Sequence, residues 1–232
     1  MPGQIASSRQ TGLLLAMLLG VTGLSYCGES GPKKGDKVRL PEPRVSGNVS
    51  VEQALQQRRS CREFSTKPLD LEQVGRLLWS AQGITGDRGR RTTPSAGATY
   101  PLECYLVAGR VDSLKPGIYR YVPQEHSLVA VAAGDRRGAL SVAASNQEFV
   151  ARAPISIVIA ADYGRTSMRY GDRGQRYVHI EVGHCAENIA LECEALGLGT
   201  VCVGAFADDD VRSKLELTED PVCIMPVGWK SE

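Results

Sequence analysis

The sequence predicts an α+β fold in which helices flank a central mixed or antiparallel sheet. Segments with a helical period alternate with short apolar segments rich in β-branched residues, which is typical of a layered sandwich. The 232 residues are 42% hydrophobic, enough to build a substantial core as one domain. The 27 basic and 26 acidic residues nearly balance. No broad electrostatic field therefore favours nucleic acid, and no nucleic-acid partner is expected.

Residues 1–27 have the composition of an export signal. Arg9 precedes an apolar run over residues 13–24, which is short for a membrane span but suits a secretory signal. The run leads into Leu24-Ser25-Tyr26-Cys27, which resembles a bacterial lipoprotein cleavage site, although a tyrosine stands where a small residue is usual. A lipidated Cys27, a plainly cleaved signal and an uncleaved anchor all remain open. We expect a bacterial protein that is exported, either periplasmic or anchored to the membrane.

Residues 28–48 are expected to form a flexible tether. They are rich in glycine, proline and charge and have no apolar period, as is usual for linkers. The folded domain is therefore expected to span residues 49–232.

The cysteine pattern favours buried free thiols over disulfides. Six cysteines remain besides Cys27, with no CxxC pair and mostly inside apolar segments. Cysteine packs as a small hydrophobe, which explains this placement, but an even number leaves disulfides open.

Two capping patterns and two further segments predict the helices. Ser50 is followed three positions later by Gln53, and Asp70 by Gln73, a spacing that lets each pair satisfy the first N–H groups of a helix. The predicted helices are Val51–Gln57, Leu71–Gln82, Arg176–Ala195 and Asp208–Leu215.

Short β-branched and aromatic runs predict the strands. The run over residues 155–161 is apolar throughout, which suits a strand buried on both faces. Residues 86–91 are expected to form a mobile basic loop, in the simplest case a solvated hinge. The predicted strands are Leu102–Ala108, Gly117–Val122, Ser127–Ala132, Ile155–Ala161, Thr200–Phe206 and Val222–Val227.

Gly197, Gly199 and Gly204 do not form a dinucleotide-binding fingerprint. That motif needs a strand before the glycines and a helix after them, whereas here the predicted order is helix, glycines, strand. We expect Gly197 and Gly199 to end the helix and Gly204 to mark a close approach of the backbone to another group.

Four segments in a fixed order suggest a pocket for a phosphorylated aromatic cofactor. Together they provide an early cationic anchor, a small-residue loop and a late glycine-flanked strand. The segments are Arg58-Arg59-Ser60-Cys61-Arg62-Glu63-Phe64, Pro94-Ser95-Ala96-Gly97-Ala98-Thr99-Tyr100-Pro101, Gly197-Leu198-Gly199-Thr200-Val201-Cys202-Val203-Gly204-Ala205-Phe206 and Pro226-Val227-Gly228-Trp229. The ordered set resembles the nitroreductase family of FMN-dependent oxidoreductases, and within it the SagB/ThcOx-type dehydrogenases.

The resemblance implies roles for the cationic anchor. Arg58 would bind the FMN phosphate, Ser60 would donate its hydroxyl, and Arg62 would lie at the pyrimidine edge of the flavin. Arg59 belongs to the same anchor, and Lys230 would be a second phosphate-binding cation. A solvated helix end would explain the composition of the anchor without any ligand.

The resemblance also implies a homodimer. Pro94, Ser95 and Ala96 would come from the second subunit and close over the FMN, although residues 94–101 could equally be an ordinary turn. The backbone N–H groups at Gly204-Ala205 would face flavin N5.

Two further features concern the subgroup and the flavin edge. Many nitroreductases have a glutamate at the position of Gly204, and its absence here favours the SagB subgroup. The side-chain amide of Gln147 would lie at the flavin edge, unless Gln147 simply occupies a surface turn.

Some SagB-type enzymes oxidise azoline rings in ribosomal peptides with a Lys-Tyr pair near the start of the long helix. Arg176-Tyr177 occupies that place. Because arginine stays protonated, Tyr177 is the acid/base candidate, and purely structural roles remain open for both residues. His179 and His184 point to different sides of the same helix, so no metal is predicted.

The expected activity is hydride transfer between flavin N5 and a small-molecule or peptide substrate, with NAD(P)H as a candidate transient electron donor. Two alternatives are a classical NAD(P)H-dependent nitro or quinone reductase and an exported, non-catalytic flavin- or ligand-binding module.

Overall fold

The computed structural model describes residues 1, 3 and 31–231. The predicted export signal, including Cys27, lies outside the residues described in detail. Residues Gly31–Glu232 form one compact unit. Within the part of the chain that the structure describes, no helix is long and apolar enough to cross a membrane.

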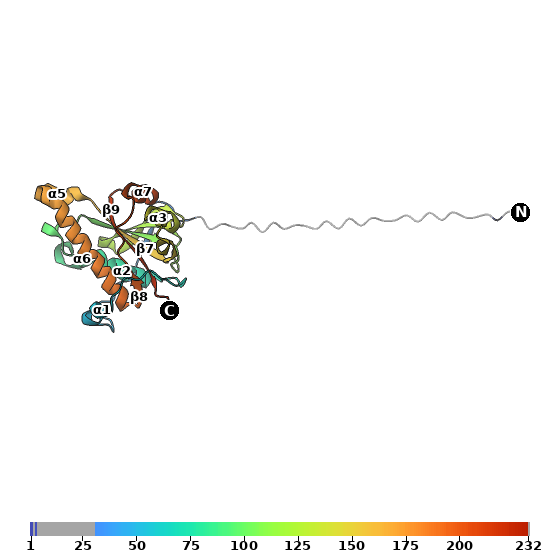
Figure 1. Ribbon diagram of the computed structural model, residues 1–232, viewed down its shortest axis with the longest axis horizontal. Helices are drawn as coiled ribbons and strands as arrows, with labels where there is room; N and C mark the ends of the chain where they lie inside the picture. The colour runs from blue at the N-terminus through green and yellow to red at the C-terminus, as the bar shows by residue number, and fades with distance from the viewer. Residues whose placement is uncertain (2, 4–30, 232) are drawn as a thin grey trace. The chain divides into compact units, whose positions relative to one another are not determined.

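A seven-stranded sheet lies at the centre of the unit (Figure 1). The strand order is β1-β6-β5-β4-β7-β9-β8, and every neighbouring pair is antiparallel. The strands are β1 (Lys37–Arg39), β4 (Leu102–Ala108), β5 (Gly117–Val122), β6 (Ser127–Ala133), β7 (Ile155–Ala161), β8 (Leu198–Thr200) and β9 (Asp220–Trp229). As its apolar sequence predicted, β7 is buried along its whole length between β4 and β9.

Helices cover both faces of this sheet. The helices are α1 (Val51–Gln57), α2 (Leu71–Gln82), α3 (Arg137–Ala143), α4 (Glu148–Arg152), α5 (Tyr163–Tyr170), α6 (Gly174–Ala195) and α7 (Asp208–Leu215). One core cluster joins α2 and α6 to the sheet, and a second joins α3 and α7 to it. The long helix α6 runs diagonally across the view, with α2 beside it (Figure 1). The predicted α+β sandwich is confirmed.

The predicted capping boxes are present at α1 and α2. The Ser50 hydroxyl accepts a hydrogen bond from the Gln53 N–H at 3.2 Å, and the Gln53 side-chain oxygen accepts one from the Ser50 N–H at 2.8 Å. Asp70 and Gln73 repeat the arrangement. Each box satisfies N–H groups that have no partner within the helix, so these starts could be located from sequence.

The expected tether over residues 28–48 is wrong for most of its length. Lys37–Arg39 forms edge strand β1, paired with β6, and Leu40 is buried in the core. The Leu40 N–H donates to the carbonyl of His126 at 3.0 Å. The folded unit begins at Gly31. Strand β1 was missed because three residues are too few to show a period among glycines and prolines.

The predicted strand Thr200–Phe206 is also wrong. Strand β8 ends at Thr200, after which only Val203 keeps a bridge to β9, through Ile224. Gly204 and Ala205 are exposed. The chain therefore leaves the sheet here and presents open backbone at its edge.

Three smaller differences concern turns and short helices. Gly197 follows α6 with φ +69°, as predicted for a helix end, but Gly199 lies inside β8 and not in the cap. The predicted basic loop contains a small hairpin of β2 (Ile84–Gly86) and β3 (Arg90–Arg91). Helices α3, α4 and α5 were not predicted; none of them begins with the capping box that located α1 and α2.

Candidate functional site

The early cationic segment lies against the end of strand β8. Ser60 forms a parallel bridge with Thr200, and the Cys61 N–H donates to the Thr200 carbonyl at 2.8 Å. Arg58 is the residue at which α1 ends. The turn after α1 is therefore fixed at the sheet edge, beside the segment that carries Gly204 and Ala205.

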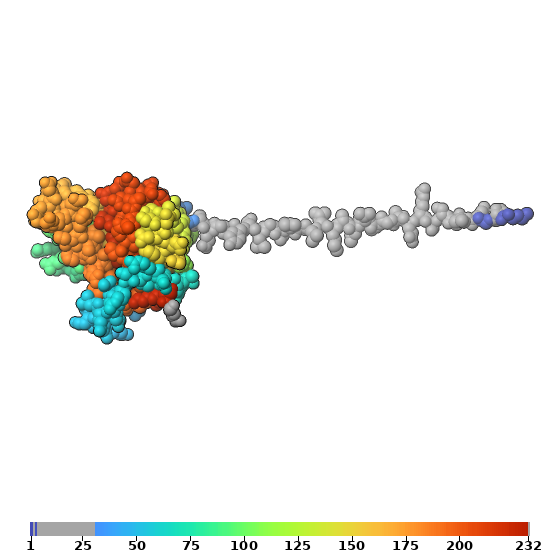
Figure 2. Space-filling model, viewed as in Figure 1, coloured from blue at the N-terminus to red at the C-terminus, as the bar shows by residue number. Residues whose placement is uncertain are grey.

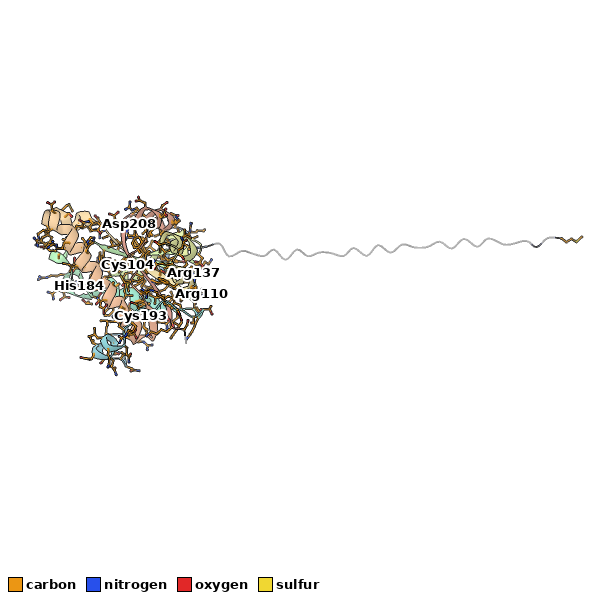
Figure 3. All side chains as sticks on the ribbon, viewed as in Figure 1. Cys104, Arg110, Arg137, His184, Cys193 and Asp208 are labelled. Atoms are coloured by element: carbon orange, nitrogen blue, oxygen red, sulfur yellow. The ribbon has the colours of Figure 1, made fainter. Side chains whose placement is uncertain are left out.

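A cavity of about 240 Å³ opens between this turn and helix α6. One wall is the turn itself, the opposite wall is a stripe of α6, and the floor is formed by residues that follow β8 and by β9. The lining residues used below are Arg58, Arg59, Ser60, Glu187, Glu194 and Cys202. On α6 this stripe runs from Gly183 to Glu194, and Figure 3 labels His184 and Cys193 beside its two ends.

Two carboxylates of α6 that line this cavity are each paired with a cation. Nε of Arg58 lies 3.5 Å from Oε1 of Glu187. Nζ of Lys230 lies 2.8 Å from Oε2 of Glu194, which is almost fully buried. Lys230 directly follows β9, so the C-terminal cation is held by a carboxylate about two helical turns from the one that holds Arg58. The sequence predicted both cations but not the two glutamates.

Arg59 lines the same cavity but makes a different set of contacts. Its Nη1 donates to the carbonyl of Gln56 at 3.0 Å and to that of Arg58 at 2.7 Å. These carbonyls belong to the end of α1, where helix acceptors lack partners within the helix. Arg59 therefore closes the end of α1.

Gln147 and Arg62 lie near the open backbone that follows β8. Nε2 of Gln147 donates to the carbonyl of Ala205 at 3.1 Å and to that of Ala144 at 2.9 Å. Cζ of Arg62 lies 5.8 Å from the ring centroid of Phe149, two residues after Gln147. A Cβ atom built on Gly204 would meet nothing within 4 Å. The structure thus leaves room at the backbone position that the sequence singled out.

The small-residue loop lies at a second cavity, also of about 240 Å³. Pro94, Ser95 and Ala96 line it together with Tyr177, Ile180, Glu181 and His184 of α6. The Ser95 hydroxyl accepts from the Tyr100 N–H at 2.9 Å, which holds the turn. Because successive residues of a helix point about 100° apart, the two stripes of α6 face different directions. Within one chain the loop does not reach the Arg58 cavity.

Tyr177 and Arg176 separate at the start of α6. The Tyr177 hydroxyl accepts from Nε of Arg173 at 3.3 Å, and its ring packs edge-on against Tyr170 with the centroids 5.0 Å apart. Arg176 lies instead at a broader hollow of about 590 Å³ with Asp172 and His179. Of the predicted pair, Tyr177 lies beside the small-residue loop.

Glu181 is a buried carboxyl at the second cavity that sequence reasoning missed. It is 2% exposed, and its Oε1 has no hydrogen-bond partner among the residues that the structure describes. Burial raises its pKa to about 7, against a smaller opposing effect of a hydrogen bond from Ser95. Its place one turn after Tyr177 on the long helix was the available signal.

The described residues contain no group of three or more His, Cys, Asp or Glu side chains placed to hold a metal ion. Within the same range all six cysteines are free thiols; Cys104, Cys185, Cys193 and Cys223 are buried as the sequence predicted, whereas Cys61 is half-buried and Cys202 is exposed.

Comparison with known proteins gives a consistent result. The sequence model of the nitroreductase family, described as "Nitroreductase family", matches residues 55–229 of this chain. MJ1384 of Methanocaldococcus jannaschii, a protein named for its similarity to nitroreductases, is 46% identical over 198 residues, 85% of this chain and 100% of that protein. The microcin B17-processing protein McbC of Escherichia coli is 25% identical over 145 residues, 60% of this chain and 53% of its own length.

Solved structures agree with the family match. A crystal structure assigned to the nitroreductases, from Ralstonia eutropha JMP134, has a TM-score of 0.74 and 31% identity, covering 87% of this chain and 95% of that one. The NADPH:FMN oxidoreductase from Vibrio harveyi, complexed with NAD+, shares the fold with a TM-score of 0.57 and 20% identity, covering 78% of this chain and 69% of that one. The chain is therefore an oxidoreductase of the nitroreductase family.

Proposed function

We propose that this protein is an FMN-dependent oxidoreductase of SagB type, which passes a hydride between the flavin and an organic substrate. The observation that carries the proposal is that Arg58 and Ser60 line one cavity with Glu194, the partner of Lys230, and with Cys202, two residues before the open backbone at Gly204-Ala205.

The residues present fit FMN in charge and in shape. Arg58 and Lys230 supply two cations, and Ser60 a hydroxyl, for a dianionic phosphate. Their pairing with Glu187 and Glu194 keeps these cations compensated, and a phosphate would exchange for the carboxylates. The open space at Gly204 admits a flat ring close to backbone.

The chain's own residues would orient and tune the cofactor. The Ala205 carbonyl is held by Gln147, which fixes the segment whose N–H groups would face the flavin. Arg62 would place positive charge at the ring edge, where the reduced flavin gathers negative charge. FMN, when bound, supplies the two-electron hydride chemistry, and the protein supplies placement, charge and proton handling.

The second cavity fits a role across a homodimer interface. Ile180 lines this cavity and is exposed. Val51 and Leu55 on α1 are exposed as well. In Figure 2 the orange surface of α5 and α6 adjoins the blue-green surface of α1 and α2 on one face. We infer that a second copy covers this area, so that Pro94, Ser95 and Ala96 close over the FMN of the partner, with Tyr177 as the acid/base group.

The substrate is proposed as a small molecule or a peptide. The peptide option rests on the likeness to a protein named for microcin B17 processing. NAD(P)H is proposed as a transient electron donor because of the NADPH:FMN oxidoreductase among the fold neighbours. Arg176 lies away from the loop, so we assign the proton transfer to Tyr177 alone.

Co-expression of two complementary variants tests the shared site. Arg58→Ala damages the phosphate side, and Ala96→Trp blocks the loop side. Each variant alone should bind FMN more weakly and stay largely empty at an FMN concentration near the dissociation constant of the unsubstituted protein. A mixed dimer keeps one intact site, so random pairing should restore FMN to about a quarter of all sites. No recovery in the mixture would contradict a site shared between subunits.

Flavin content separates the alternatives. Purified protein that is colourless and does not take up added FMN would support a binding module without turnover. Yellow protein that NAD(P)H bleaches would support an oxidoreductase, whether of SagB type or a nitro or quinone reductase.

We also propose export with a lipid tether at Cys27, on the sequence pattern alone. The test is the distribution of the protein between membrane and soluble fractions. Cys27→Ser should release it from the membrane, and an unchanged distribution would refute the tether.

A further inference from the structure

Two cysteines far apart in the sequence meet at the wall of the Arg58 cavity. Sγ of Cys202 lies 2.9 Å from Sγ of Cys223. Cys202 is exposed and lines the cavity, whereas Cys223 is 2% exposed and belongs to the core cluster on the α6 side of the sheet. One sulfur is therefore open to a reactant and the other is shielded behind it.

Backbone hydrogen bonds fix the two chain segments that carry Cys202 and Cys223. The Val203 N–H donates to the Ile224 carbonyl at 2.9 Å, and the Ile224 N–H donates to the Val203 carbonyl at 3.0 Å. This doubly hydrogen-bonded pair directly follows both cysteines. Cys223 is also registered against Ile159 in the buried strand β7. Each cysteine precedes one residue of this antiparallel pair, so the two lie diagonally across it on one face of the strands, where side chains can reach each other.

The two thiols differ in reactivity. A hydrogen bond from the Cys223 thiol lowers the pKa of Cys202 to about 7. The same contact, together with burial, raises the pKa of Cys223. The thiolate is the attacking form of cysteine, so the exposed sulfur is the nucleophile. The buried sulfur remains protonated until it is needed to resolve an intermediate.

The surroundings carry charges of both signs. Arg58 and Arg59 line the same cavity as Cys202, together with Glu187 and Glu194. Glutathione disulfide carries both carboxylates and ammonium groups, which can pair with these guanidinium and carboxylate groups. By contrast, Cys104, Cys185 and Cys193 are buried, and Cys61 donates its thiol to the Glu63 carbonyl at 3.2 Å.

We propose that Cys202 and Cys223 form a thiol–disulfide exchange site that takes a low-molecular-weight disulfide, of the glutathione class, as its oxidant. The Cys202 thiolate attacks one sulfur of the disulfide, its S–S bond breaks, and one glutathione leaves as thiolate. Cys223 then loses its proton to solvent and attacks Cys202 in the mixed disulfide, and the second glutathione leaves. Two protein thiols are oxidised to one disulfide, and one glutathione disulfide is reduced to two thiols.

The site does not depend on FMN, although the two share a cavity wall. Closing the disulfide would tie the segment after β8 to β9, immediately before the backbone at Gly204-Ala205. The reaction is therefore testable on protein with and without added FMN, by chemical analysis of the thiols alone.

The experiment uses the full-length protein, first reduced and then equilibrated in glutathione buffers of increasing disulfide fraction. Remaining thiols are alkylated, and the peptides are mapped by mass spectrometry. We expect Cys202 and Cys223 to lose alkylation together and to appear as one linked peptide. If both remain alkylated at every ratio, or if Cys202 stops as a stable glutathione adduct in the unsubstituted chain, the proposal is wrong.

Three variants assign the roles of the two cysteines. Cys223→Ala should stop the reaction at a glutathione adduct on Cys202, and Cys202→Ala should leave Cys223 alkylated throughout. Cys61→Ala is the matched control, because Cys61 is not among the residues that line this cavity, and this variant should form the linked peptide as the unsubstituted chain does. A linked peptide between other cysteines in the unsubstituted chain would contradict the pairing.

Discussion

The ammonium group of Lys230 lies 2.8 Å from a carboxylate oxygen of Glu194, whose side chain is only 5% exposed. A buried carboxylate thus holds the last cation of the chain at the cavity that Arg58 lines. Any phosphate that binds Lys230 must compete with this carboxylate, and that competition can be measured.

Glu194→Gln should tighten FMN binding by about 1 kcal/mol, roughly fivefold. The substitution removes a negative charge that competes for Lys230 and would repel the phosphate. Titration of FMN followed by fluorescence quenching measures the dissociation constant. The control is Glu192→Gln on the same helix. The Glu192 carboxylate pairs with Arg76 at 2.7 Å and lines another cavity, so the FMN affinity of this variant should not change. Equal affinities for all three proteins would remove Lys230 from the phosphate site.

Arg58→Ala should weaken FMN binding by about 2 kcal/mol, because it removes a charge-assisted contact to the phosphate. Arg59→Ala is the adjacent control. Arg59 donates to carbonyls at the end of α1. Its loss should therefore lower the free energy of unfolding by more than it lowers the free energy of FMN binding. Calorimetric titration and urea unfolding of both variants check this. If Arg59→Ala loses more FMN affinity than Arg58→Ala, then Arg59 and not Arg58 is the phosphate-binding residue.

Ala205→Val should slow flavin reduction more than it weakens FMN binding. The larger side chain would push the ring from the backbone, and a displacement of about 1 Å can lower the rate on the order of a hundredfold. Ala205→Gly keeps the N–H and should react nearly as fast as the unsubstituted protein. Stopped-flow reduction under single-turnover conditions measures both rates. If the valine variant reacts at the normal rate with FMN bound, Ala205 is not at the reacting edge.

Glu181 should make the protein less stable as the pH rises toward neutrality. Burial raises its folded-state pKa to about 7, above the ordinary value, so the fold favours the protonated form. Its stabilising effect is complete below the unfolded-state pKa and is lost as the pH rises through 7, by up to about 3 kcal/mol. Urea unfolding between pH 4.5 and 8 measures this.

Glu181→Gln should remove that part of the pH dependence, because the amide stays neutral. Glu187→Gln changes an exposed carboxylate on the same helix and should leave the profile unchanged. A Glu181→Gln profile that follows the unsubstituted protein at every pH would show that the buried carboxyl is not responsible.

Much of the fold was predictable because local chemistry determines it. The capping boxes at Ser50 and Asp70 and the continuous apolar run of β7 depend on neighbouring residues, and each was located from sequence. Strand β1 could not be located, since its three residues become a strand only by pairing with β6. The run after Thr200 alternates like a strand, but most of it has no partner in the sheet.

The residues of the candidate site were proposed from sequence, but their contacts could not be. The four segments indicated Arg58, Ser60 and Gly204, the family resemblance added Gln147 and Lys230, and the roles of all five stay predictions. The pairing of the two cations with glutamates of α6 depends on how that helix is rotated against the sheet, which no local pattern specifies. The meeting of Cys202 with Cys223 depends in the same way on the register at β9.

The flavin content of the purified full-length protein tests the central claim most directly. The cofactor is released by denaturation, identified by mass spectrometry and quantified by absorbance, with added FMN supplied to protein that purifies without it. We predict FMN in a ratio close to one per chain. Protein that contains no flavin and takes up none from an FMN solution, while retaining its fold by circular dichroism, would contradict the account.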